Sequence, residues 1–254
     1  NPFALEGVGH TIIKHIYQVL PGHFLKISAA CVKPKQKRWW DTLENRPKIP
    51  DLYEAQIEEF FRIFQDSTLL RLRSDVKIAT AISGGVDSSA IYCMLMAIAR
   101  NPQLAKRRFP NDWQQAFVAT FPDTSIDEKK YADEVLQFTG GKANYITPNY
   151  NNLVDDIVSK TLFFDSVYLT PISIVSDIYA AMRQHGNKIS LDGHGVDEML
   201  LGYPHFSETA YLEAVQNNKT DLANDYWETY KALFPSETQI SLKKPSPNIG
   251  WKIR

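Results

Sequence analysis

Short apolar runs alternate with amphipathic stretches along most of the chain. The apolar runs, bounded by glycine or polar residues, predict buried parallel strands at 76–82, 116–121, 144–147 and 188–191. Apolar residues that recur every three or four positions predict helices at 51–74, 86–100, 128–139, 151–164, 171–185, 207–216 and 220–233. This alternation predicts an α/β domain with a mostly parallel sheet and flanking helices.

The first 50 residues lack this alternation and are expected to form a lead-in. The stretch from Leu20 to Ile27 predicts a turn followed by a strand, and Pro50 interrupts the chain before the first long helix. Asp51 is expected to cap that helix, because its side chain can accept a backbone N–H. The sequence thus predicts two parts, a lead-in over 1–50 and a domain over 51–254.

Composition excludes several classes of protein. Of the 254 residues, 44% are hydrophobic and 22% are charged, which is typical of a folded globular chain. A net charge of −1 gives no electrostatic footprint for nucleic acid or for an anionic membrane. No apolar run approaches the ~18 residues that a spanning helix needs. The two cysteines, Cys31 and Cys93, are too few for a four-ligand zinc site or a disulfide framework, so a cytoplasmic protein is expected.

The strand predicted at 76–82 runs into a glycine-rich turn that opens a helix. Glycines let the backbone approach a phosphate, and the free N–H groups of a first helical turn point at an anion. Hydroxyl donors and one carboxylate accompany the glycines, in the run Ser83, Gly84, Gly85, Val86, Asp87, Ser88 and Ser89. No lysine follows, which excludes the G-x-x-x-x-G-K-[ST] loop and favours a site that holds a leaving pyrophosphate.

The carboxyl end of the strand predicted at 116–121 is expected to form one side of an adenosine-binding site. Nucleotides in open α/β sheets lie at the carboxyl ends of the strands. Thr120 and Phe121 are therefore expected to contact the base through backbone and ring.

The strand predicted at 188–191 ends in a second glycine-containing turn, which is again expected to lead into a helix. Three acids and a histidine follow within seven residues, in the run Asp192, Gly193, His194, Gly195, Val196, Asp197 and Glu198. Charge this dense beside a buried strand is costly unless a metal, a substrate or solvent compensates it.

Both turns resemble motifs of one superfamily. The run Ser83–Ser89 closely resembles the pyrophosphate loop S-G-G-x-D-S-S of the ATP pyrophosphatase superfamily. The superfamily includes the asparagine synthetases, and Asp192–Tyr203 is similar to their S-G-x-G-x-D-E-x-x-x-G-Y motif. Pro21–Leu25 is similar to the P-G-H-x-L segment of the glutamine-dependent asparagine synthetases. The resemblance covers roughly 1–215 and implies an adenine-nucleotide α-hydrolase-like fold.

The resemblance implies a reaction and its participants. MgATP would activate a carboxylate substrate, aspartate-like in the asparagine synthetases, as an acyl-adenylate with release of pyrophosphate. Ammonia or an amine would then displace AMP and leave an amide. Asp87 and Asp197 would hold Mg²⁺, and Gly193 would let its turn close over the substrate. The resemblance also implies a glutaminase domain before residue 1 and a C-terminal part longer than this chain has.

A third segment, Asp127–Ala132, resembles the family's D-E-x-x-x-A pattern. It makes Asp127 a candidate for holding the metal and pyrophosphate. The same residue is equally well placed to cap the helix that follows, and the two roles are compatible.

Two residues depart from the family pattern. Asp192 stands where the family usually has serine or threonine, and His194 stands where asparagine synthetases carry glutamate and β-lactam-forming relatives carry tyrosine. Histidine takes up a proton near neutral pH, so a general-base role survives chemically. The alternative interpretation of His194 is a loop histidine without a catalytic role, whose ring is bonded to a carboxylate such as Asp192 or Asp197. No lysine after residue 240 sits in a recognisable catalytic motif, although the C-terminal region offers Lys243, Lys244 and Lys252.

Three other functions fit the same motifs. An enzyme that forms an intramolecular amide, a lactam or a peptide macrocycle would use the same adenylate. A non-catalytic nucleotide-binding module would keep only the loop. A tRNA-modifying enzyme would need a basic surface, which this chain lacks. The identity of the two substrates and the oligomeric state stay open at this level.

Overall fold

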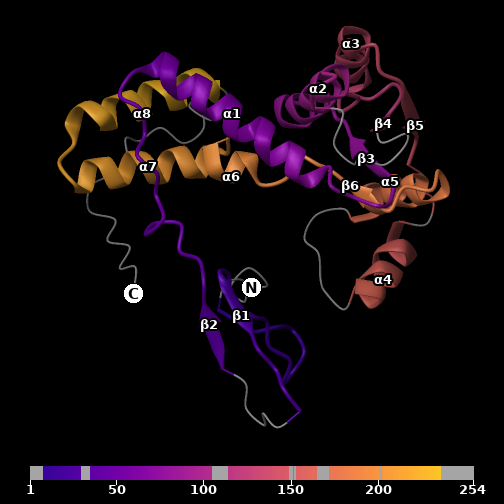
Figure 1. The fold of residues 1–254 in the computed structure, drawn as a ribbon, viewed down its shortest axis with the longest axis horizontal. Coiled ribbons are helices and arrows are strands. Elements are labelled where there is room, and N and C mark those ends of the chain that lie inside the picture. Colours follow the sequence, from indigo (N-terminus) through magenta and orange to yellow (C-terminus); the bar gives the residue numbers. More distant parts are fainter. Residues whose placement is uncertain are drawn as a thin grey trace.

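The computed structural model describes residues 8–29, 35–104, 114–148, 151, 153–164, 172–200 and 202–235. Four strands form one parallel sheet in the order β5-β4-β3-β6. They are β3 (Ile78–Ala81), β4 (Gln115–Ala119), β5 (Ala143–Ile146) and β6 (Ile189–Ser190). The predicted α/β class with a parallel sheet is confirmed (Figure 1).

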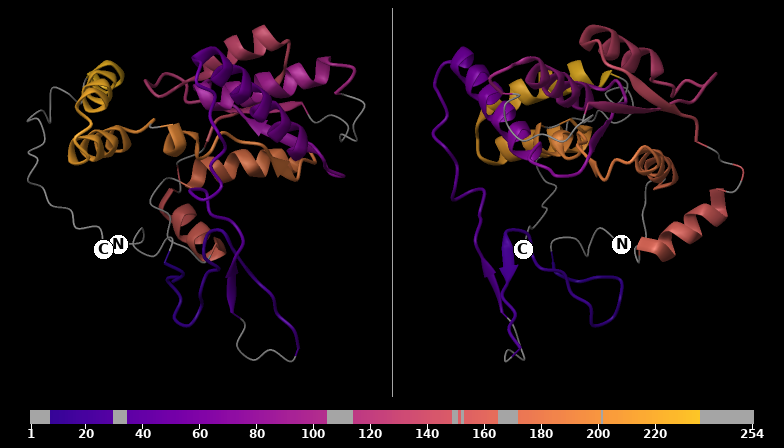
Figure 2. Two further views of the ribbon diagram at one scale, coloured as in Figure 1. Left: turned by 60° about the vertical axis from the view of Figure 1, so that its left-hand side comes forward. Right: turned by 45° about the vertical axis from the view of Figure 1, so that its right-hand side comes forward.

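Helices cover both faces of this sheet, as Figure 2 shows. Those that follow the lead-in are α1 (Tyr53–Arg71), α2 (Val86–Arg100), α3 (Lys129–Thr139), α4 (Leu153–Phe164) and α5 (Ile172–Gln184). Residues of α2 and α3 pack on one face of β4 through Ala116 and Val118, whereas Met182 of α5 packs against Phe117 on the other. Successive residues of a strand point to opposite faces of the sheet. A strand that is covered on both faces therefore has a continuous run of apolar residues in its sequence.

The helix α1 differs from its prediction at the start. Its N-cap is Leu52, whose side chain makes no capping bond, so Asp51 does not cap it. Near its C-terminus, Leu69 and the following Leu72 are buried with residues of β3 and α2. Toward its N-terminus the apolar side chains of Ile57 and Phe60 are exposed. The apolar spacing therefore marks a helix here, but only its second half enters the core.

The remaining elements lie to the sides of the sheet. In the lead-in, β1 (His23–Leu25) and β2 (Gln36–Arg38) form an antiparallel pair that projects from the body (Figure 1). After the short helix α6 (Val196–Leu200), α7 (Pro204–Gln216) and α8 (Thr220–Leu233) pack as a helical hairpin through Tyr211, Ala214 and Ala223. Within the described part of the chain, no helix has the length and apolarity to cross a bilayer.

Candidate active site

The two glycine-containing turns meet at one edge of the sheet. Because β3 and β6 are parallel neighbours, their carboxyl ends lie side by side, and each leads into a turn and a helix. The turns approach each other closely at Gly193, where an added Cβ would stand 3.0 Å from the carbonyl carbon and Cβ of Asp87 and from the backbone nitrogen of Ser88. The sequence motifs that are about 100 residues apart thus share one site.

A pocket of about 640 Å³ opens between the turns. That volume is in the range of small-molecule and cofactor sites. The first turn contributes Ser83, Gly85, Val86, Asp87 and Ser88, and the second contributes Asp192, Gly193, His194 and Asp197. The walls come from the strand ends and from α5 and the segment before α3, through Ala81, Ile82, Ala119, Phe121, Ile126, Glu128, Ile174 and Ile178. Within that list, Ile126, Ile174 and Ile178 carried no sequence signal, because only the tertiary fold brings them here.

Hydroxyl groups hold the first turn in shape. The backbone N–H of Ser83 donates to Ser88 Oγ at 3.2 Å, and that of Gly85 donates to Ser83 Oγ at 3.1 Å. The two hydroxyls lie 3.0 Å apart. Gly84 has a φ of +90°, and a Cβ there would stand 2.5 Å from Tyr131 Cβ. Glycine is required at this position both for the backbone conformation and for the contact with α3.

Negative charge accumulates on one side of the pocket. Burial, and then the charges of Asp197 and Glu198, raise the pKa of the Asp87 carboxyl above its ordinary value. The same three carboxylates raise the pKa of the Tyr203 phenol, Glu198 having the largest effect. A cation in this space would relieve the repulsion among these groups.

The carboxylates fit a magnesium ion that also binds phosphate. Among the described residues no three His, Cys, Asp or Glu side chains are close enough to hold a metal by themselves. Mg²⁺ is commonly bound by one or two carboxylates together with substrate phosphates and water, so a Mg²⁺ site needs fewer protein ligands. Asp87 and Asp197 both line the pocket and supply oxygen ligands of the kind that Mg²⁺ prefers.

Three of the predicted site residues lie differently. Asp127 does not line the pocket, and its carboxylate accepts the backbone N–H of Lys129 at 3.1 Å at the start of α3, as a helix-starting residue does. Thr120 is buried, with its N–H bonded to Ile146 O and its hydroxyl 3.0 Å from Thr147 Oγ1, so it faces β5. The Ser89 hydroxyl is buried and has no hydrogen-bond partner among the described residues.

Asp192 connects the end of β6 to its surroundings. Its Oδ1 accepts the backbone N–H of Ala81 at 3.0 Å and the hydroxyl of Ser190 at 2.5 Å. Its Oδ2 accepts the hydroxyl of Tyr179 at 2.9 Å, and His194 Nε2 stands 4.0 Å from the same oxygen. Burial, together with the bond to Asp192, raises the pKa of Tyr179 to about 12, so the phenol stays a donor. Sequence reasoning named neither Tyr179 nor Ser190.

Comparison with known proteins decides the family. The sequence model described as asparagine synthase matches residues 59–248. The chain belongs to the asparagine synthase family. The resemblance predicted from the two turns is confirmed, and membership supports ATP-dependent amide formation by a ligase-type enzyme at the level of the family. The lysines Lys243, Lys244 and Lys252 lie outside the described residues.

Relatives within the asparagine synthase family are distant. Amidase chyE of Penicillium rubens is 26% identical over 211 residues, covering 77% of this chain and 30% of that protein. Amidase chry2 of Gibberella zeae is 24% identical over 244 residues, covering 91% and 35%. Asparagine synthetase [glutamine-hydrolyzing] 3 of Bacillus subtilis is 23% identical over 217 residues, covering 84% and 34%. The chain therefore spans about a third of the length of these relatives.

Among solved structures, an NH3-dependent NAD synthetase from Campylobacter jejuni matches with a TM-score of 0.39 and 11% identity. The match covers 74% of this chain and 98% of that one.

Proposed function

We propose that the chain catalyses ATP-dependent amide formation through an acyl-adenylate, with release of AMP and pyrophosphate, on a small carboxylate substrate. The observation that carries the proposal is the close approach of Gly193 to Asp87 and Ser88, where an added Cβ would stand 3.0 Å from their atoms. It closes a hydroxyl-lined glycine turn and a carboxylate-lined turn around one pocket. A turn of small donors suits the two outer phosphates, while the apolar wall at Phe121 and Ile126 suits the adenosine.

The first step joins the carboxylate to the nucleotide. A carboxylate oxygen attacks the α-phosphorus, the bond from that phosphorus to the bridging oxygen breaks, and pyrophosphate leaves. Backbone N–H groups at the start of α2 and the hydroxyls of Ser83 and Ser88 stabilise the departing charge. Asp87 and Asp197 would hold Mg²⁺, which when bound neutralises part of the phosphate charge.

The second step forms the amide. The nitrogen of ammonia or an amine attacks the acyl carbon, the bond from that carbon to the phosphate oxygen breaks, and AMP leaves with the electron pair. The attacking nitrogen must lose a proton, and His194, which lines the pocket, accepts it. Histidine suits this task near neutral pH.

We further propose that residues 1–50 link this synthetase domain, 51–254, to a glutaminase domain that supplies ammonia. Relatives named as glutamine-hydrolyzing asparagine synthetases support this partner, since the chain matches only about a third of their length. A cytoplasmic location, which the cysteine usage suggests, belongs to the same proposal.

The test measures pyrophosphate and AMP from ATP in the presence of a panel of carboxylates, aspartate included, with ammonia as the amine. We expect Asp87→Asn to lower pyrophosphate release about a hundredfold or more, since a group that stabilises transition-state charge is lost. Asp155→Asn, a matched change on the exposed surface of α4, should leave the rate unchanged.

Product analysis by mass spectrometry separates the alternatives. Asparagine formation supports an asparagine synthetase-like reaction, and loss of water from a single bifunctional substrate supports the lactam or macrocycle synthetase. ATP binding without pyrophosphate release for any carboxylate and amine would contradict the proposal and leave a nucleotide-binding module.

A further inference from the structure

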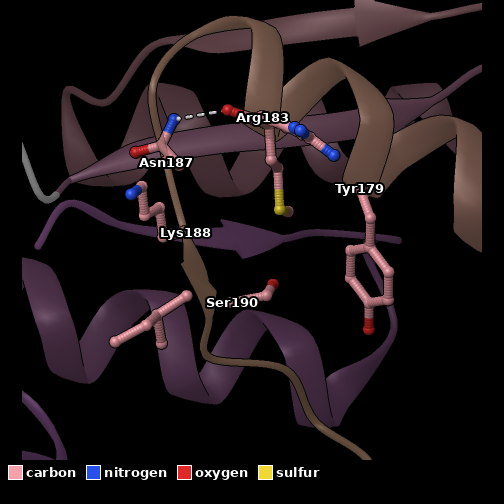
Figure 3. Close-up of a pocket in the computed structure, with 7 residues that line it drawn as sticks. Tyr179, Arg183, Asn187, Lys188 and Ser190 are labelled. Atoms are coloured by element: carbon pink, nitrogen blue, oxygen red, sulfur yellow. Dashed lines mark hydrogen bonds between the residues drawn. The ribbon is translucent and has the colours of Figure 1, made fainter.

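Asp192 lies between two cavities. On one side is the pocket between the turns, which Asp192 and His194 line. On the other side a second cavity of about 620 Å³ runs along β6 and α5. Figure 3 shows Tyr179 on one side of this second cavity, Asn187 and Lys188 on the other side, and Ser190 between them. The hydroxyls of Tyr179 and Ser190 reach the carboxylate of Asp192.

The carboxylate of Asp192 is fixed by its partners. Its side chain is only 9% exposed, and three donors from β3, β6 and α5 hold its two oxygens. The N–H of Ala81 and the hydroxyl of Ser190 share Oδ1. Oδ2 accepts one hydrogen bond from Tyr179, and a carboxylate oxygen can accept two. One acceptor position therefore remains on Oδ2, the oxygen to which His194 is nearest.

The imidazole of His194 is free to use that position. Its side chain is 78% exposed, in contrast to the carboxylate beside it. Nε2 stands 4.0 Å from Asp192 Oδ2, which is about 1 Å longer than a hydrogen bond. The preceding Gly193 and following Gly195 leave the backbone on both sides without a side chain. Because the ring is exposed, its side-chain torsions can change without displacing a packed neighbour, and a shift of about 1 Å would bring Nε2 within hydrogen-bond distance of Oδ2.

We propose that Asp192 is a positioning residue, whose Oδ2 accepts the Nε2–H of His194 and so fixes the imidazole tautomer that keeps Nδ1 unprotonated. The inference rests on the proposed function for its catalytic consequence. When the amine attacks the acyl-adenylate, the C–N bond forms, the bond from the acyl carbon to the AMP oxygen breaks, and the proton of the amine passes to Nδ1. The Asp192 carboxylate then faces the resulting imidazolium and stabilises its charge.

Alkylation of the histidine tests the positioning without any substrate. Bromoacetamide, which is neutral, reacts with whichever ring nitrogen carries the free lone pair. The peptide that contains His194 is isolated and its two isomers are separated. In the wild-type protein we expect the Nδ1 product to predominate. In Asp192→Asn the ratio of Nδ1 to Nε2 product should fall about fivefold, the factor that corresponds to one hydrogen bond.

The amide variant keeps the local packing. Asparagine retains an oxygen for the N–H of Ala81 and the hydroxyl of Ser190, while its NH₂ replaces the oxygen that faces His194. Asp155→Asn, on α4, is the matched control and should leave the isomer ratio at the wild-type value. An unchanged ratio in Asp192→Asn would overturn the proposal, whatever the enzyme catalyses.

Kinetics test the consequence for the reaction. We expect Asp192→Asn to slow amide formation from ammonia about tenfold or more, and to leave hydroxamate formation from the less basic hydroxylamine within about twofold of wild type. A residue that acts only through His194 should add nothing when His194 is absent, so Asp192→Asn with His194→Ala should match His194→Ala alone. A double variant that is several-fold slower than His194→Ala would contradict this role.

The two proposals fail in different ways. A shifted alkylation ratio without pyrophosphate release for any carboxylate would support the positioning of His194 and refute the proposed function. Pyrophosphate release and amide formation with an unshifted ratio would support the function and refute the positioning.

Discussion

Replacing Gly193 with alanine probes the contact between the two turns. The added Cβ would lie 3.0 Å from three atoms of Asp87 and Ser88, two of them backbone atoms. Ordinary contacts of a methyl group with such atoms are nearer 3.5 to 4 Å, so the turns must separate by several tenths of an ångström. Forcing a methyl group into a well-packed site costs about 1–3 kcal/mol. If the contact closes the pocket around the phosphates, that cost appears in the transition state as a loss of about five- to 150-fold in kcat/KM.

The assay is pyrophosphate release at limiting ATP, with a thermal unfolding curve for each variant. Gly195→Ala is the matched control, because Gly195 has a φ of +87° and an added Cβ there meets nothing within 4 Å. That variant carries backbone strain of about 1–2 kcal/mol without touching the first turn. Gly186→Ala, with a φ of +80° at the end of α5, reports the same strain outside the pocket. Wild-type kcat/KM in Gly193→Ala would refute the reasoning that the two turns act together.

Three further outcomes follow from the structure. Because burial and the charges of Asp197 and Glu198 raise the pKa of Asp87, the folded protein binds this proton more tightly than the unfolded chain, and its stability falls as pH rises through that range. Asp87→Asn should therefore raise the melting temperature at neutral pH, and calorimetry should show the gain disappearing in acid. Phe117→Ala, at a fully buried position of β4, should cost about 3–5 kcal/mol in urea unfolding. Asp192→Asn should lower the pKa of Tyr179 from about 12, but not to its ordinary value, because the burial that also raises this pKa remains. An ultraviolet titration, with Tyr179→Phe as the reference, measures the shift.

The elements with strong local signals were predicted well. The strand–turn–helix units at β3–α2 and β6–α6 were both predicted, since glycines and a change of apolar period mark each boundary. The end of β4 was placed two residues too late, because Thr120 continues the backbone pairing with Ile146 but the chain turns immediately after it. Asp51 failed as a cap because the helix begins one residue later, at a junction whose geometry depends on the lead-in.

Within the candidate site, the residues on the two turns were predicted, and so was Phe121 on the wall, whereas the wall residues from α5 were not. Ile174 and Ile178 come from a helix whose apolar spacing says only that one face is buried, not what that face covers. Tyr179 is more instructive still, because its partner is a carboxylate thirteen residues later in sequence, at the end of a strand. Neither residue type nor spacing distinguishes a tyrosine that holds a carboxylate from one that packs in the core.

The amino-acid sequence by itself determined the class of the domain and the two glycine-containing turns. These properties are local, since they depend on glycines, hydroxyls and apolar periods over a dozen residues. The tertiary structure alone decided that β6 lies beside β3, that Gly193 lies close to Asp87, and that Asp192 receives donors from three elements. Strand order is set by how the helices cover the two faces of the sheet, which is a property of the whole chain and of no single segment.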